Sequence, residues 1–315
     1  MRYYQRETHE AVLEALSKGV MRQVISSPTG SGKTVTFASL IPMIPPPSSK
    51  ARQVMVLAHR EELLDQALEK IQAANPNLSV EVEQATRKAA PTTDVVIASV
   101  PTLGRQGSER IRKFDPERFK AIIVDECHHS VASGYINVLE YFGALSDDSP
   151  ILVLGFSATP RRSDNVGLER VFQEITYHKS LLDMIEEGFL CRMRAMRIAT
   201  GTDISSVATR MGDFAEGQLA EAINTPERNQ ILLQAWQEHA SDRRSTLVFA
   251  ADLPHIQDIV TIFIKAGIEA HGVDSKNTSK EERRSLLERF RAGKFPVYAN
   301  YGIYCEGADI PGTDC

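Results

Sequence analysis

Short apolar segments alternate with segments of helical periodicity through the first half of the chain. The helical pattern is clearest over residues 60–74, where apolar side chains recur every three or four positions. The apolar segments are almost continuous, which is typical of strands in a parallel sheet covered on both faces. Because parallel neighbours are joined through crossover helices, this order predicts a doubly wound α/β domain. The predicted strands are residues 23–26, 53–58, 94–99, 121–125 and 151–157.

A second α/β segment follows a polar and loosely patterned stretch. Three apolar strand patterns alternate there with two helical patterns, as in the first half. We therefore predict a first domain of residues 1–198, a linker of residues 199–227 and a second domain of residues 228–315. The predicted elements of the second domain are residues 246–251, 255–267, 268–273, 278–293 and 295–303.

The composition limits the classes of protein that this sequence can form. Hydrophobic residues make up 42% of the 315 residues and charged residues 24%, which is enough for two globular cores. The net charge of −5 excludes a chain that is basic overall, although a local basic groove can still bind nucleic acid. The cysteines form no C-x-x-C pair, so a reducing compartment is expected. The sequence has neither a long apolar run nor an apolar signal region, so we expect no membrane span and no secretion.

The segment "SSPTGSGKT" (26–34) stands where the first strand ends and a helix begins. Gly30 and Gly32 allow backbone N–H groups to approach a phosphate at a helix N-terminus. Lys33 can reach the β and γ phosphates, and the Thr34 hydroxyl can bind Mg²⁺. Ser27 replaces the first glycine of the strict P-loop pattern, so an ordinary glycine turn is the alternative interpretation. The strand before the segment and the helix after it favour a phosphate-binding loop.

The segment "AIIVDECHHS" (121–130) ends an apolar strand with two acids. Beside a phosphate-binding loop, Asp125 would hold Mg²⁺ through a water molecule, and Glu126 would orient and deprotonate the attacking water. The alternative is zinc bound by Cys127, His128 and His129. Zinc is disfavoured because consecutive side chains at a strand end point in different directions and the usual spaced ligand pairs are missing.

Taken in order, these segments resemble the motifs of superfamily 2 helicases and translocases. The matching segments are "SSPTGSGKT", "VLAHREELLDQ", "VDECHH", "GFSATP" and "CEGADIP". The DExH box, followed by a second histidine, and the opening "RYYQRETHEAV" look like the group of the type III restriction subunit. The second half looks most like fungal mitochondrial members that act on branched double-stranded DNA.

The resemblance implies two RecA-like P-loop NTPase domains with parallel sheets, and ATP and Mg²⁺ as cofactors. It implies that Gln5 reads adenine, that Arg60 and Thr102 contact the nucleic-acid backbone, and that His128, Ser157 and Thr159 couple the nucleotide state to movement. Basic residues at 105, 110, 112 and 113 would extend the nucleic-acid surface or form an ordinary solvated face. The implied catalytic residues are Lys33, Asp125, Glu126 and His128, and the implied Mg²⁺ ligands are Thr34 and Asp125. The implied nucleotide-binding residues are Gln5, Pro28, Thr29, Gly30, Ser31, Gly32, Lys33, Thr34, Gly307 and Asp309.

The family pattern continues with a Q-x-x-G-R-x-x-R-like helix that this sequence does not contain. The resemblance therefore implies an incomplete second domain, truncated at its C-terminal side, that binds ATP but hydrolyses it poorly. An arginine finger contributes on the order of 10³ to 10⁵ in turnover. Three hypotheses follow: a nucleic-acid motor with DNA favoured over RNA, a weakly catalytic nucleotide- and nucleic-acid-binding module, and a P-loop enzyme for small molecules. The motifs in the second half argue against the last. A mitochondrial location rests on the resemblance alone.

Overall fold

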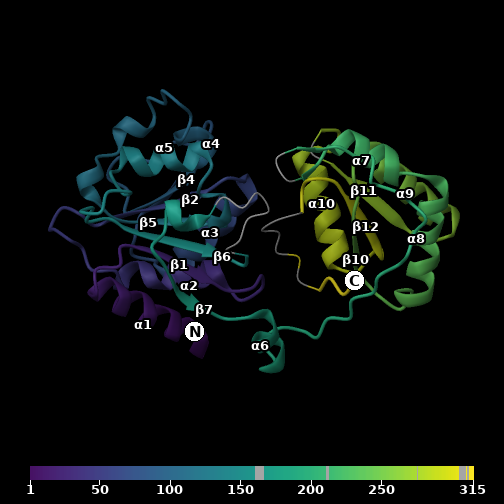
Figure 1. Cartoon of the computed structure of the whole chain (residues 1–315), viewed down its shortest axis with the longest axis horizontal. Coiled ribbons are helices and arrows are strands. Elements are labelled where there is room, and N and C mark those ends of the chain that lie inside the picture. Colours follow the sequence, from purple (N-terminus) through teal and green to yellow (C-terminus); the bar gives the residue numbers. More distant parts are fainter. Residues whose placement is uncertain (160–166, 211–212, 275, 305–309, 311) are drawn as a thin grey trace. The chain divides into compact units, whose positions relative to one another are not determined.

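The structure, a computed structural model, describes residues 1–159, 167–210, 213–274, 276–304, 310 and 312–315 (Figure 1). It divides into two compact units, Met1–Met193 and Arg194–Cys315. Residues 199–227, the predicted linker, thus group with the second unit. Within the described ranges no helix is both long and apolar enough to span a bilayer.

The first unit is built on a seven-stranded parallel sheet with the strand order β3-β4-β2-β5-β6-β1-β7. The strand order places β6 between β1, which carries the phosphate-loop sequence at its end, and β5, which carries the acids. The strands are β1 (Arg22–Ser26), β2 (Gln53–Ala58), β3 (Val80–Glu83), β4 (Val95–Ser99), β5 (Phe119–Asp125), β6 (Leu152–Ser157) and β7 (Glu174–His178).

Helices cover both faces of this sheet because its central strands are apolar on both sides. Along β5, Ile122 and Val124 belong to one core cluster, and Ala121 and Ile123 belong to the other. The first cluster is completed by α4 and α5 and the second by α1, α2 and α3 (Figure 1). The helices are α1 (Tyr3–Ser17), α2 (Lys33–Leu40), α3 (Glu61–Ala74), α4 (Val100–Leu103), α5 (Ser133–Tyr141) and α6 (Leu181–Glu186), with 3₁₀ turns η1 (Ile41–Met43), η2 (Ile111–Lys113), η3 (Pro116–Arg118), η4 (Cys127–His129) and η5 (Leu168–Arg170).

The predicted α/β fold class is confirmed, and the five predicted strands of the first half correspond to β1, β2, β4, β5 and β6. The prediction missed β3 and β7, which are the two edge strands of the sheet. An edge strand has fewer neighbours, so its sequence needs no continuous apolar run. In β7 every residue is exposed or half-buried, and its sequence "EITYH" carries no strong strand pattern.

The second unit contains a smaller parallel sheet with the strand order β10-β12-β11 and a two-stranded antiparallel pair, β8-β9. Trp236 on α8 anchors one core: its ring packs edge-on against Phe263, and its Nε1 donates a hydrogen bond of 2.8 Å to Thr246 Oγ1. Its strands are β8 (Thr209–Arg210), β9 (Asp213–Phe214), β10 (Thr246–Phe249), β11 (Ala270–Val273) and β12 (Val297–Asn300), and its helices are α7 (Glu216–Ile223), α8 (Pro226–His239), α9 (Leu253–Lys265) and α10 (Lys280–Arg291).

Acid should weaken the second unit through the buried His255 at the start of α9. Its Nδ1 accepts from the Ala251 backbone N–H, and its Nε2 lies 3.1 Å from Asn229 Oδ1, so the ring fits only as a neutral donor–acceptor. Burial lowers the pKa of His255 below its ordinary value of 6.5. The His255 side chain is therefore protonated more readily in the unfolded chain than in the folded unit. The contribution of neutral His255 to the free energy of unfolding is fully present above pH 6.5. It decreases as the pH falls below 6.5, by at most about 1.4 kcal/mol per pH unit.

Tryptophan emission during urea unfolding of the full chain measures this effect, because Trp236 is the only tryptophan and lies in the second unit. We expect a lower free energy of unfolding at pH 5 than at pH 7. The His255→Gln variant cannot titrate at this position and should show a smaller difference. An equal pH dependence in both proteins would contradict the assignment to His255.

Candidate nucleotide and nucleic-acid site

The candidate residues of the first unit gather at one edge of the large sheet. In a parallel sheet all strands end at the same edge, and ligands bind there, outside the carboxyl ends. The strand order β4-β2-β5-β6-β1 therefore brings together segments that are far apart in the sequence. The predicted residues that follow these strands are Thr102 after β4, Arg60 after β2, the acids and His128 at the end of β5, Ser157 and Thr159 at the end of β6, and the phosphate loop after β1.

The phosphate loop owes its shape to two glycines in the left-handed region, Gly30 and Gly32, both with φ of +82°. A side chain at Gly30 would meet Leu190 Cδ2 at 3.0 Å. Ser27, which replaces the first glycine of the strict pattern, is buried and accepts a 3.1 Å hydrogen bond from Ser31 Oγ. A serine in place of the first P-loop glycine is therefore accommodated in this loop, because its hydroxyl has a hydrogen-bond partner there. The other predicted residues, Pro28, Thr29, Lys33 and Thr34, complete the loop and open α2.

Helix α1 packs directly on the phosphate loop. The Tyr4 hydroxyl donates to the Ser31 carbonyl oxygen at 2.8 Å. Gln5 is only 5% exposed, and its Nε2 lies 3.0 Å from where a Cβ on Gly32 would stand. Its Oε1 accepts from the Arg2 backbone N–H at 2.9 Å. The residue predicted to read adenine is thus held against the phosphate loop.

Sequence reasoning missed a second group beside this helix. Lys179 Nζ donates to Tyr3 Oη at 2.8 Å and to Glu187 Oε1 at 2.6 Å, and Tyr3 also donates to Glu187. Phe189 packs on Tyr3, with ring centroids 5.7 Å apart. The two tyrosines before Gln5 could have drawn attention to this helix. The partners after β7 carried no signal, because they are distant in sequence and follow an edge strand.

The acid pair at the end of β5 lies in a dry environment. Asp125 is 5% exposed, and burial, followed by the nearby Glu126 carboxylate, raises the pKa of Asp125 to about 6. Lys33 Nζ lies 3.8 Å from Glu126 Oε1. Glu126 has φ of +49°, an uncommon conformation for a side chain of this size. Two close carboxylates with a single lysine form the oxygen-rich, negative environment that a hard cation such as Mg²⁺ stabilises.

The acid pair connects through His128 to the end of β6. His128 Nδ1 lies 3.5 Å from Glu126 Oε2 and 3.1 Å from Ser157 Oγ. Ser157 Oγ in turn accepts from the Thr159 backbone N–H at 3.1 Å. Four predicted residues, from Glu126 to Thr159, therefore form one line of contacts.

Among the residues of the zinc alternative, the two histidine rings contact each other, with centroids 4.1 Å apart, whereas Cys127 has apolar neighbours. Cys127 belongs to the hydrophobic core, where burial raises the pKa of its thiol and keeps it protonated. His128 contacts Glu126 and Ser157, whereas the His129 ring packs against the His59 ring.

The two residues predicted to contact nucleic acid follow neighbouring strands. Arg60 directly precedes α3, and its Nε donates to His59 Nε2 at 3.3 Å. Thr102 lies in α4, where its Oγ1 is 3.4 Å from the Ala85 backbone nitrogen. Both side chains are half-buried. They stand on the side of β5 away from the phosphate loop, since β4 and β2 follow β5 in that direction.

Two of the basic residues considered for a wider nucleic-acid surface serve the fold instead. Glu83 has a fully buried carboxylate that binds Lys113 Nζ at 2.5 Å and Arg110 Nε at 2.6 Å. Arg110 also donates to the Arg87 carbonyl oxygen at 2.9 Å. These contacts fasten the loop after β3, which includes Ala85 at a φ of +42°. Arg105 is exposed, and Arg112 pairs with Glu109.

Two further predictions fall outside the described residues. Gly307 and Asp309, expected to meet the nucleotide, lie within residues 305–309. Their predicted role stays a prediction.

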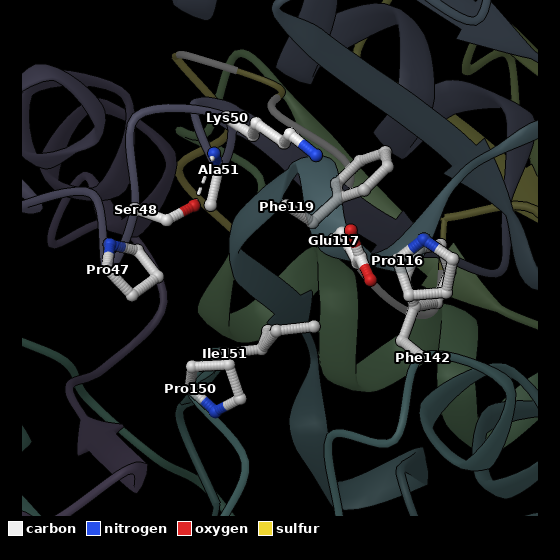
Figure 2. A pocket seen from close by; sticks show the side chains of 10 residues that line it. All are labelled: Pro47, Ser48, Lys50, Ala51, Pro116, Glu117, Phe119, Phe142, Pro150 and Ile151. Carbon is white, nitrogen blue, oxygen red and sulfur yellow. Dashed lines mark hydrogen bonds between the residues drawn. The ribbon is translucent and has the colours of Figure 1, made fainter.

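A separate cavity of about 440 Å³ opens at the opposite end of the strands (Figure 2). It reaches Phe119 at the start of β5, and a strand of this length places that end roughly 20 Å from the acids. The cavity is therefore distinct from the candidate site. It is lined by Pro47, Ser48, Lys50, Ala51, Pro116, Glu117, Phe119, Phe142, Pro150 and Ile151.

A parallel sheet with a glycine phosphate loop after one strand and a buried acid pair after another defines a P-loop NTPase of the RecA-like type. The family described as "Type III restriction enzyme, res subunit" matches residues 1–162, about half of the chain. The chain belongs to this family, which confirms the family resemblance seen in the sequence.

Curated relatives agree with this assignment. A protein of Schizosaccharomyces pombe named as a mitochondrial ATP-dependent helicase, irc3, is 36% identical over 315 residues, which are 100% of this chain and 51% of the relative. The ATP-dependent helicase IRC3 of Saccharomyces cerevisiae is 34% identical over 322 residues, covering 100% of this chain and 46% of the relative. The chain thus spans about half the length of these relatives.

A solved structure supports the fold. The structure of S. cerevisiae Dbp5 bound to RNA and ADP BeF3 covers 96% of this chain and 72% of its own, with a TM-score of 0.59 and 16% sequence identity. At this identity the likeness shows a shared fold alone.

Proposed function

We propose that this chain is an ATP-dependent nucleic-acid helicase or translocase. The observation that carries the proposal is the line of contacts at the carboxyl edge of the sheet. It starts at Lys33 in the phosphate loop, passes through Glu126 and His128, and ends at Ser157. An enzyme that converts nucleotide hydrolysis into movement needs such a connection between its phosphate site and the rest of the domain.

In this proposal the residues at the phosphate loop bind the nucleotide. Gln5 reads adenine, and the backbone N–H groups of residues 29–32 surround the phosphates at the start of α2. Lys33 neutralises the β and γ phosphates. Thr34 and Asp125 would hold Mg²⁺, which would supply charge stabilisation for the leaving phosphate. The raised pKa of Asp125 supports this role: burial and the nearby Glu126 carboxylate disfavour its charged form, and a bound cation would favour that form.

Glu126 would orient the attacking water and accept its proton. His128 and Ser157 would transmit a change in the position of Glu126 to the end of β6. Thr159 continues this series of contacts, because its backbone N–H donates to Ser157 Oγ. Arg60 and Thr102 would contact the phosphate backbone of nucleic acid with a guanidinium and a hydroxyl, which are typical donors for phosphate.

DNA is favoured over RNA as the partner, and mitochondria as the location. A relative from Sulfurisphaera tokodaii, 22% identical over 236 residues, is named a DNA 3'-5' translocase, and the S. pombe relative is named mitochondrial. We further propose a nucleotide-binding domain of residues 1–198 and a second domain of residues 228–315, with residues 199–227 between them.

Turnover of ATP by the full chain, with and without forked DNA or single-stranded RNA, tests the proposal. We expect a low rate of turnover that DNA stimulates, and we expect the Lys33→Ala variant to lose the stimulated activity because its phosphate loop lacks the lysine cation. Binding of nucleotide without any turnover would favour the nucleotide- and nucleic-acid-binding module. An ATP turnover rate that is the same with and without nucleic acid would contradict a helicase or translocase and favour a small-molecule enzyme.

A further inference from the structure

A stack of three imidazole rings runs from the acid box to the segment that carries Arg60. The rings of His128 and His129 have centroids 4.1 Å apart at 45°. The rings of His129 and His59 have centroids 4.5 Å apart at 64°. His59 follows β2 and His129 follows β5, and these strands are neighbours in the sheet. The stack therefore links the ends of two adjacent strands.

The first ring of the stack contacts the hydrolytic side of the site. His128 Nδ1 lies 3.5 Å from Glu126 Oε2, the carboxylate proposed to hold the attacking water. His128 and His129 are consecutive residues of η4, a single tight turn. A shift of the His128 ring would therefore be felt by the His129 ring, which it contacts directly.

The last ring of the stack contacts Arg60. A guanidinium can only donate, so His59 Nε2 is the acceptor in the 3.3 Å contact with Arg60 Nε. The His59 ring is therefore neutral on this side and carries its proton on Nδ1, which lies 3.5 Å from the hydroxyl of the buried Tyr135. Tyr135 and His129 thus both contact the His59 ring, which in turn contacts Arg60.

We propose that His59 and His129 are positioning residues that couple nucleotide binding to nucleic-acid binding within the first unit. The inference rests on the proposed function, because it takes Glu126 as the residue near the γ phosphate and Arg60 as a nucleic-acid contact. In this proposal His129 acts through the rings of His128 and His59 and not through a contact of its own with either ligand. Its effect passes through ring contacts, which have a preferred geometry and resist displacement more than a pair of flexible chains would.

The coupling is measured as a ratio of affinities. The anisotropy of a labelled forked DNA, titrated with the full chain with and without a non-hydrolysable ATP analogue and Mg²⁺, gives two dissociation constants. Their ratio is the coupling factor, and typical allosteric factors are about 5 to 150. We expect a factor of about 5 or more for the wild-type chain, and within about twofold of 1 for His129→Ala. A purely structural role for His129 would weaken both affinities and leave their ratio unchanged.

Two further variants separate the alternatives. His129→Phe keeps a ring in the stack and should retain most of the coupling factor, which also serves as a check on folding. Arg60→Ala should weaken DNA binding in both nucleotide states. A wild-type factor near 1, a wild-type value in His129→Ala, or an equal loss in His129→Phe and His129→Ala would each overturn the inference.

The outcome is distinguishable from that of the proposed function. DNA-stimulated turnover together with an unchanged coupling factor in His129→Ala would support the proposed helicase function and contradict the coupling role of the histidine stack. A coupling factor that depends on His129, in a chain that does not turn over ATP, would support the coupling role of the histidine stack and contradict the proposed helicase function.

Discussion

Glu126→Gln should lower ATP turnover by about 10² to 10⁴, the range that general acid–base catalysis contributes, while nucleotide binding persists. The glutamine has nearly the shape of glutamate but cannot accept the proton of the attacking water. Lys33 stays available for the phosphates, and it loses only a partner that lies 3.8 Å away. The expected pattern is therefore a low kcat with a dissociation constant for ATP close to that of the wild-type chain.

Steady-state turnover in the presence of DNA, together with calorimetric titration of ATP, measures the two quantities. The matched control is Glu117→Gln, the same change at an exposed residue of η3, just before β5, where Glu117 borders the cavity of Figure 2. It should leave both quantities unchanged. Turnover within a few-fold of wild type in Glu126→Gln would remove Glu126 from the role of general base.

Gly104→Ala should destabilise the first unit by about 3 kcal/mol, at the upper end of the usual cost of overpacking. A Cβ at Gly104 would lie 2.1 Å from the Gly134 carbonyl oxygen and 2.8 Å from the Gly134 Cα. Both are backbone atoms, so no side-chain rotation can relieve the clash. The contact joins the end of α4 to the start of α5, and Asn137 of α5 reinforces it by donating to the Gly104 carbonyl oxygen at 2.9 Å.

Hydrogen exchange of the β2 and β5 amides measures the opening free energy of this unit. Gly107→Ala is the control: its φ of +74° disfavours alanine, but nothing lies within 4 Å of the new methyl group. Left-handed strain alone costs about 1 to 2 kcal/mol. An equal decrease in opening free energy in the two variants would show that the backbone at the α4–α5 contact can shift at little energetic cost. Tyr135 follows Gly134 directly and its hydroxyl lies 3.5 Å from His59 Nδ1, so Gly104→Ala should also reduce the nucleotide–DNA coupling factor.

The central sheet could be predicted from sequence because its physical requirements are local. A strand buried on both faces must be apolar at nearly every position, and β2 and β5 show this directly as "QVMVLA" and "FKAIIVD". The phosphate loop was equally visible, because its two left-handed residues must be glycines. The edge strands β3 and β7 escaped prediction: β7 is exposed or half-buried throughout, and the buried positions of β3, with the sequence "VEVE", include the charged Glu83, so neither strand shows a continuous apolar run.

The sequence by itself determined the α/β fold class, the family, and the chemical types of the groups that could bind nucleotide. Each is carried by a short run of residues, because strand burial, a glycine turn and a strand-end acid act over a few positions. The tertiary structure alone decided which distant groups meet. The strand order placed β5 beside β2, which brought His129 to His59, and the buried Glu83 engaged Arg110 and Lys113 that the sequence left open as a nucleic-acid surface. Such contacts depend on how strands are ordered and how loops close over them, and no local pattern of residues records that order.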